Sequence, residues 1–128
     1  MAIFKARAKT KRTGSGARYK DYRKKKLIDL GRQPSLTAIG AKKMRVIKGR
    51  GFTNKFRLLV AEKVNLFDPK TKKYSSAKIT AVVESPSNSQ YVRRNIITKG
   101  AIVQTDKGKA KITSRPGQHG VCNAVLVA

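Results

Sequence analysis

Residues 101–127 read AIVQTDKGKAKITSRPGQHGVCNAVLV, and they carry the clearest indication of the fold class. Its apolar runs are short, and a turn signal separates each run from the next. Asp106–Gly108 is typical of a β-hairpin turn, and it leads into a predicted strand over 109–114. Pro116–Gly120 turns the chain again into Val121–Val127, an apolar run bounded by glycine, which we expect to be a central, buried strand. The stretch therefore predicts consecutive short strands.

The pattern of short apolar runs separated by turn signals continues towards the N-terminus. Further strands are predicted at 43–48, 55–62, 64–67, 77–84 and, around a glycine, 96–103. Tyr91–Arg94 predicts one helical turn, capped by Asn88 or Ser89. Short strands with turns every ten or so residues, and no long amphipathic helix between them, favour an all-β barrel or sandwich. We predict a mostly β fold, in which residues 41–128 form a small closed or nearly closed β-barrel of about six short strands.

Residues 1–40 are predicted to be a basic, largely irregular N-terminal extension. Residues 1–26 carry eleven basic side chains against one acid, Asp21, and they show no sustained apolar period. Such a segment cannot bury enough apolar surface to offset its ordering entropy, so we expect it to order only on a partner. A short helix is expected over residues 20–30, stopped by Gly31.

The charge of the chain indicates the class of that partner. The 128 residues contain 31 Lys and Arg against six Asp and Glu, which gives a net charge of +25 at pH 7. Self-repulsion on this scale opposes compaction, so a polyanion that neutralises it is expected, and nucleic acid is the leading candidate.

Lys and Arg side chains can neutralise phosphates, and arginine forks match them bidentately. Tyr19 and Tyr22 lie among basic residues, where they could stack on unpaired RNA bases or simply cover the barrel. Lys24–Lys26 also fits a localisation signal or a solvated face. The predicted RNA-binding residues are Lys5, Arg7, Lys9, Lys11, Arg12, Arg18, Tyr19, Lys20, Tyr22, Arg23, Lys24, Lys25, Lys26, Arg32, Lys42, Lys43, Arg45, Lys48, Arg50, Arg57, Arg93, Arg94, Lys99 and Arg115.

Membrane, disulfide and metal functions are disfavoured by the same inventory. The longest apolar run, Ala124–Ala128, has five residues, whereas a membrane helix needs about 20. The N-terminal residues form no apolar signal-peptide core, so we expect the chain to stay inside the cell. One cysteine and one histidine allow neither an intrachain disulfide nor a Cys/His metal site.

Enzyme chemistry has little support. The six acids never form a close pair at strand or helix spacing, and two of them belong to turn signals. His119 and Cys122 lie three residues apart, but no third group is evident to orient them as a catalytic dyad. We therefore expect no catalytic residues, no metal, no cofactor and no small-molecule substrate.

Two long segments resemble a known family. Residues 91–102, YVRRNIITKGAI, and 112–118, ITSRPGQ, closely resemble the eight-e family of small-subunit ribosomal proteins of archaea and eukaryotes. The likeness extends through residues 11–14, 30–32 and 83–84 to 123–127, and the short chain looks like the archaeal form. The sequence departs from the family pattern at Ser85, Ser89, His119 and Cys122.

The resemblance implies a structural component of the small subunit: a β-barrel seated on ribosomal RNA, with an N-terminal extension running into the RNA. The implied partners are small-subunit ribosomal RNA and neighbouring ribosomal proteins in the cytoplasm, without a homo-oligomer. Two alternatives stay open, namely a ribosome-assembly factor, because related nucleolar factors share the C-terminal pattern, and a general nucleic-acid-compacting protein, because charge alone fixes no preferred RNA.

Overall fold

The computed structural model describes residues 14–17, 26–49 and 51–127. The chain divides into two compact units, Met1–Pro34 and Ser35–Ala128. Within the described part of the first unit, the 3-10 helix η1 (Leu27–Asp29) is closed by a Leu30 N–H to Leu27 O bond of 3.0 Å. In its described part, the short helix expected over 20–30 is this single 3-10 turn, which ends before Gly31 as predicted. Residues 18–25 lie outside the described residues.

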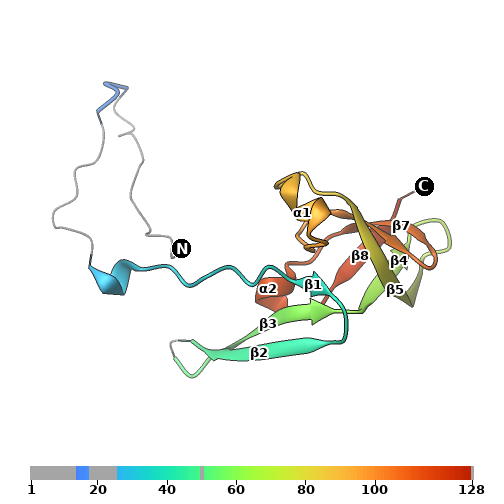
Figure 1. The fold of residues 1–128 in the computed structure, drawn as a ribbon, viewed down its shortest axis with the longest axis horizontal. Coiled ribbons are helices and arrows are strands. Elements are labelled where there is room, and N and C mark those ends of the chain that lie inside the picture. The colour runs from blue at the N-terminus through green and yellow to red at the C-terminus, as the bar shows by residue number, and fades with distance from the viewer. Residues whose placement is uncertain (1–13, 18–25, 50, 128) are drawn as a thin grey trace. The chain divides into compact units, whose positions relative to one another are not determined.

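The second unit consists of strands and two single-turn helices (Figure 1). In chain order they are β1 (Ala38–Ile39), β2 (Lys43–Lys48), β3 (Asn54–Ala61), β4 (Lys63–Asp68), β5 (Lys73–Glu84), α1 (Gln90–Arg93), β6 (Ile102–Thr105), β7 (Gly108–Ile112), α2 (Pro116–His119) and β8 (Asn123–Leu126).

Five of these strands close into a barrel in the order β4-β5-β6-β7-β8. Neighbouring strands are antiparallel except at the closure, where β4 and β8 pair in parallel with Asn65 opposite Asn123 and Phe67 opposite Val125. The long strand β5 shifts register twice against β6, between Ile79 and Ala81 and again before Glu84. Such bulges bend a strand, which helps so few strands to close.

Alternating side chains fill the barrel interior. Leu66, Ile112, Val64 and Val103 are its largest fully buried side chains. Four alanines belong to the same core, which suits the narrow interior of a five-stranded barrel; they are Ala77, Ala101, Ala110 and Ala124. The closed, mostly β barrel expected from the sequence is confirmed, with five strands.

The two most N-terminal predicted strands lie outside the barrel. β2 and β3 form an antiparallel hairpin, and β1 adds to β3 in parallel, which gives a separate sheet of order β1-β3-β2. The hydroxyl of Thr37 donates a 2.7 Å hydrogen bond to the Leu58 carbonyl oxygen and fixes the chain beside β3.

Helix α2 lies against β3. Its C-cap, Gly120, has a left-handed φ of 71° and sits directly over Phe56 and Met44.

Three further expectations need correction. The strand predicted over 96–103 begins only at Ile102, because Gly100 (φ 87°) turns the chain and the Ala101 N–H bonds back to Thr98. The Pro116–Gly120 turn contains one helical turn, α2. The run 121–127 pairs on both sides but is not buried throughout: β8 spans 123–126 and alternates one face inward and one outward.

Candidate nucleic-acid interface

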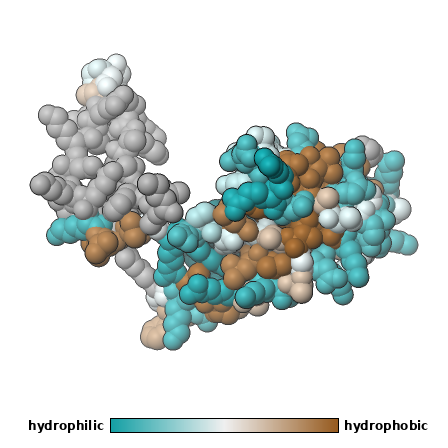
Figure 2. Space-filling view, viewed as in Figure 1, coloured by the Kyte–Doolittle hydropathy of each residue, from teal (hydrophilic) through white to brown (hydrophobic). Residues whose placement is uncertain are grey.

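Basic charge dominates the second unit. Its sequence holds 19 Lys and Arg but only four acids, Glu62, Asp68, Glu84 and Asp106. Three of these acids serve local structure: Glu62 pairs with Lys78 at 3.4 Å, Asp106 accepts a hydrogen bond from the Lys78 backbone N–H, and Asp68 accepts two in its own turn. On the face seen in Figure 2, hydrophilic side chains surround hydrophobic surface. Most of the positive charge is therefore left for an external anion.

Asp68, in the β4–β5 turn, illustrates how an acid of this unit serves local structure. The Thr71 hydroxyl donates a 2.8 Å hydrogen bond to Asp68 and a backbone N–H donates another at 2.9 Å. These bonds, the Thr71 hydroxyl first, hold the pKa of Asp68 below its usual value. The carboxylate is ionised at neutral pH and shapes the turn.

The described candidate residues share one property, which is access to solvent. Arg57 is half-buried and the others are exposed. They are Lys26 and Arg32 in the first unit, and Lys42, Lys43, Arg45, Lys48, Arg57, Arg93, Arg94, Lys99 and Arg115 in the second. The remaining candidates lie outside the described residues: Lys5, Arg7, Lys9, Lys11, Arg12, Arg18, Tyr19, Lys20, Tyr22, Arg23, Lys24, Lys25 and Arg50.

The β2–β3 hairpin brings two candidate arginines together. Arg45 stands directly opposite Arg57 in the antiparallel register, and Lys55 follows opposite Ile47 on the same face. Like charges in directly opposed positions destabilise a sheet. Two guanidinium groups presented in this way suit phosphate, which arginine forks bind bidentately. Lys55 is absent from the sequence-based candidates, because its place beside the arginine pair depends on the cross-strand register.

Helix α1 presents Arg93 and adjacent Arg94 to solvent from a firmly held turn. The side chain of Asn88, and not that of the N-cap Ser89, receives the Gln90 N–H at 2.9 Å, which resolves the expected cap. At the other end, Asn95 takes a left-handed φ of 50°, and its Oδ1 accepts the Val82 N–H of β5 at 3.1 Å. These bonds position the arginine pair on the barrel.

Arg115 and His119 belong to the α2 turn. The Arg115 N–H donates to His119 Nδ1 at 3.3 Å, and its carbonyl accepts N–H groups from Gln118 and His119. His119 therefore shapes the turn beneath an exposed arginine. Lys99 is exposed just before the Gly100 turn.

Cys122 lacks the properties of a nucleophile. It is buried, and burial raises the pKa of its thiol to about 11, so the sulfur stays protonated at neutral pH. It lines an open cavity of about 430 Å³ together with Lys42 and Lys63. In the part of the chain that the structure describes, no three His, Cys, Asp or Glu side chains are placed to hold a metal ion, and no helix there is long and apolar enough to cross a membrane.

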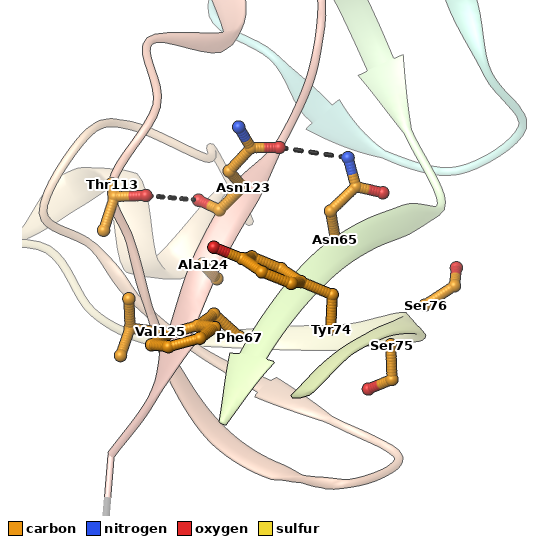
Figure 3. Close-up of a pocket in the computed structure, with 9 residues that line it drawn as sticks. All are labelled: Asn65, Phe67, Tyr74, Ser75, Ser76, Thr113, Asn123, Ala124 and Val125. Carbon is orange, nitrogen blue, oxygen red and sulfur yellow. Dashed lines mark hydrogen bonds between the residues drawn. The ribbon is translucent and has the colours of Figure 1, made fainter. Parts of the chain in front are cut away.

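Sequence reasoning missed a polar and aromatic pocket on the outer barrel face (Figure 3). Asn65 and Phe67 of β4, Tyr74 of β5 and Asn123 of β8 contribute to its lining. Strand alternation puts Asn65 and Phe67 on one face. The parallel β4–β8 register that adds Asn123 could be read only from the structure.

Comparison with known proteins places this architecture in a family. The family described as Ribosomal protein S8e matches residues 6–127, nearly the whole chain. The chain belongs to the S8e family of ribosomal proteins. The resemblance noted in the sequence is thereby confirmed.

Similar S8e relatives come from methanogenic archaea. Proteins named small ribosomal subunit protein eS8 are 48% identical over 127 residues in Methanobrevibacter smithii and 47% identical over 125 residues in Methanocella arvoryzae. These alignments cover 99% and 98% of this chain and the full length of each relative. Because the S8e family is one of ribosomal structural proteins, the expectation that the chain is no enzyme is confirmed.

Proposed function

We propose that this protein is a structural constituent of the small ribosomal subunit that binds and stabilises ribosomal RNA. In this proposal its partners are small-subunit ribosomal RNA and neighbouring ribosomal proteins, it acts as a single copy in the cytoplasm, and it catalyses no reaction. Its relatives are named small ribosomal subunit proteins, which supports the assignment.

One observation carries the RNA-binding part of the proposal. The second unit carries 19 Lys and Arg against four acids, and three of those acids are already hydrogen-bonded or ion-paired within the fold. A surface built in this way gains stability from bound phosphates, each of which also releases condensed counterions. The exposed Arg93–Arg94 pair adds a second set of contacts.

Within this proposal the two parts of the chain divide the work. Residues Met1–Pro34 thread basic side chains along RNA phosphates, and the unit Ser35–Ala128, which includes β1, folds independently and presents a fixed arginine surface. Tyr19 and Tyr22 would stack on unpaired bases beside those phosphates. Circular dichroism of a chain that lacks residues 1–26 tests this division, and an unfolded remainder would refute it.

The arginine surface is tested by measuring affinity for small-subunit ribosomal RNA across salt concentrations. Replacing both Arg93 and Arg94 with alanine should lower the log–log salt slope by roughly 1.4 to 1.8, because each lost phosphate contact removes about 0.7 to 0.9. A matched control removes two charges at the β6–β7 turn, Lys107→Ala with Lys109→Ala, and should change the slope less. Equal slopes for both double variants would show that α1 is not in the contact surface.

Sedimentation separates this role from its two rivals. A C-terminally tagged chain is followed through a gradient of cell lysate in salt that strips loosely held basic proteins. Retention in mature small subunits and translating ribosomes is expected. Retention only in immature particles would indicate an assembly factor, and release to the top of the gradient would indicate a general nucleic-acid binder.

A further inference from the structure

The outer face of the barrel carries two ordered rows of side chains across four strands. The first row follows the register Ser76, Asn65 and Asn123, and ends at Thr113, whose hydroxyl donates to the Asn123 carbonyl oxygen at 3.2 Å. The second follows Tyr74, Phe67, Val125 and Lys111. A polar row therefore lies beside an aromatic and aliphatic row.

Apart from Lys111, the residues of these rows line an open pocket of about 640 Å³ (Figure 3). Phe67 and Tyr74 form its aromatic side, with ring centroids 4.8 Å apart and planes tilted by 39°. Phe67 is half-buried and supports the pair, whereas Tyr74 is 79% exposed. An aromatic side chain so exposed contributes little to the barrel core, and one ring of the pair is free to receive a flat ligand.

The polar side of the pocket is held in a fixed geometry. Asn65 Nδ2 donates to Asn123 Oδ1 at 3.0 Å, which fixes both amides across the β4–β8 closure. Among the described residues, Asn65 Oδ1 and the Asn123 amino group have no further partner, so the pair offers one free carbonyl oxygen as acceptor and one free amino group as donor. Fixed amides beside an aromatic ring match the edge and the face of a nucleobase.

Positive charge borders the pocket. Lys63 and Lys78 lie opposite each other one step beyond the polar row, and Lys111 ends the aromatic row. Lys78 is engaged by Glu62, but the side chains of that pair are 67% and 45% exposed, so solvent screens the attraction. A base in the pocket would have lysines within reach of its flanking phosphates, whereas an acidic peptide would find no use for the aromatic platform.

We propose that this pocket binds one unpaired base of ribosomal RNA, stacked on Tyr74 and hydrogen-bonded by Asn65 and Asn123. The inference rests on the proposed ribosomal-RNA binding and adds a base-contacting site to it. Paired bases cannot enter, because stacking on Tyr74 requires a face that a duplex keeps covered. The pocket thus selects a loop, bulge or strand end of the RNA.

The first test compares the full-length protein with Tyr74→Leu, and uses Tyr74→Phe as the matched control that retains the ring. Two RNAs are titrated, small-subunit ribosomal RNA and a fully paired duplex. Tyr74→Leu should bind ribosomal RNA roughly tenfold more weakly, the effect of losing one base–aromatic stack, with an unchanged salt slope and unchanged duplex affinity. Tyr74→Phe should bind like the unaltered chain.

Equal affinity of Tyr74→Leu and the unaltered chain for ribosomal RNA would overturn the base site while leaving the proposed function standing. An unaltered chain that binds ribosomal RNA no better than duplex would instead overturn the proposed function, and the base site with it.

A second measurement needs no substitution. Trypsin releases residues 74–78 as one peptide after ultraviolet crosslinking of the unaltered protein to ribosomal RNA, and this peptide should carry a nucleotide adduct. Adducts confined to other peptides would refute the site, and a crosslink from this peptide to a neighbouring ribosomal protein in intact subunits would show that a protein occupies it.

Discussion

Gly120, at the C-terminal end of α2, packs against Phe56 and Met44 of the β2–β3 hairpin that carries Arg45 and Arg57. Replacing it with alanine is the sharpest test of the architecture. Its φ of 71° lies in the left-handed region, which costs an alanine about 1–2 kcal/mol. A Cβ atom there would also stand 2.7 Å from Phe56 Cβ and 3.3 Å from Met44 Sδ. The methionine can swing away, but Phe56 Cβ is attached to the β3 backbone and no rotamer change moves it.

The clash therefore has to be relieved by moving β3 away from α2. Overpacking of this kind costs about 1–3 kcal/mol, so Gly120→Ala should lower the free energy of unfolding by about 2–5 kcal/mol. The matched control is Gly51→Ala, where φ is 64° and nothing lies within 4 Å of the added Cβ. The control carries the conformational cost alone, about 1–2 kcal/mol.

Urea denaturation and thermal unfolding, both followed by circular dichroism, measure the difference. Each kcal/mol lowers the melting temperature by about 4–8 °C in a domain of this size, so Gly120→Ala should melt at least about 8 °C below the unaltered protein. Affinity for RNA should fall as well, because Arg45 and Arg57 move with the hairpin. Equal losses of stability for the two variants would refute the reasoning, since they would show that α2 and β3 are not in contact.

Three further predictions concern polar groups of the barrel. The Cys122 thiol has a pKa of about 11 in the fold against 9.0 in the unfolded chain. Its contribution to the free energy of unfolding is therefore fully present below pH 9 and falls by about 2–3 kcal/mol as pH rises to 11. The free energy of unfolding of Cys122→Ala, measured by denaturation, should lack this part of the pH dependence. Ser114 Oγ holds two backbone groups between α2 and β8, at 3.0 and 2.8 Å, so Ser114→Ala should cost about 1–3 kcal/mol in urea denaturation, and a loss near zero would show that the bonds are dispensable. Thr71→Ala should raise the pKa of Asp68 towards its usual value, because the Thr71 hydroxyl is the main cause of the lowering; the stability that this bond adds is present at neutral pH and is lost as pH falls through the folded-state pKa. An NMR titration in which the pKa of Asp68 does not move would contradict that cause.

The sequence predicted strands well where turn chemistry and alternation agreed. The Asp106–Gly108 hairpin and the run 77–84, within β5, are of this kind. The sequence did not separate the β2–β3 hairpin from the barrel, because both have the same alternation of apolar and polar residues. That separation depends on which strand edge β1 joins and on the contact between Gly120 and Phe56, and both contacts link residues distant in the chain.

The candidate site was predictable as a class of chemistry and not as a surface. Among the described residues every Lys and Arg except Arg57 is exposed, so charge alone cannot rank Arg45 above Lys48. The strand register ranks these residues, because Arg45 lies opposite Arg57 whereas the Lys48 side chain lies on the other face of β2. The pocket follows the same rule in its polar part. Asn65 and Asn123 are 58 positions apart and come from strands that meet only when the barrel closes, whereas Phe67 and Tyr74 already face each other across the β4–β5 hairpin. A contact surface for RNA is therefore a property of strand pairing, and substitutions that shift the register should impair binding even when every basic side chain remains.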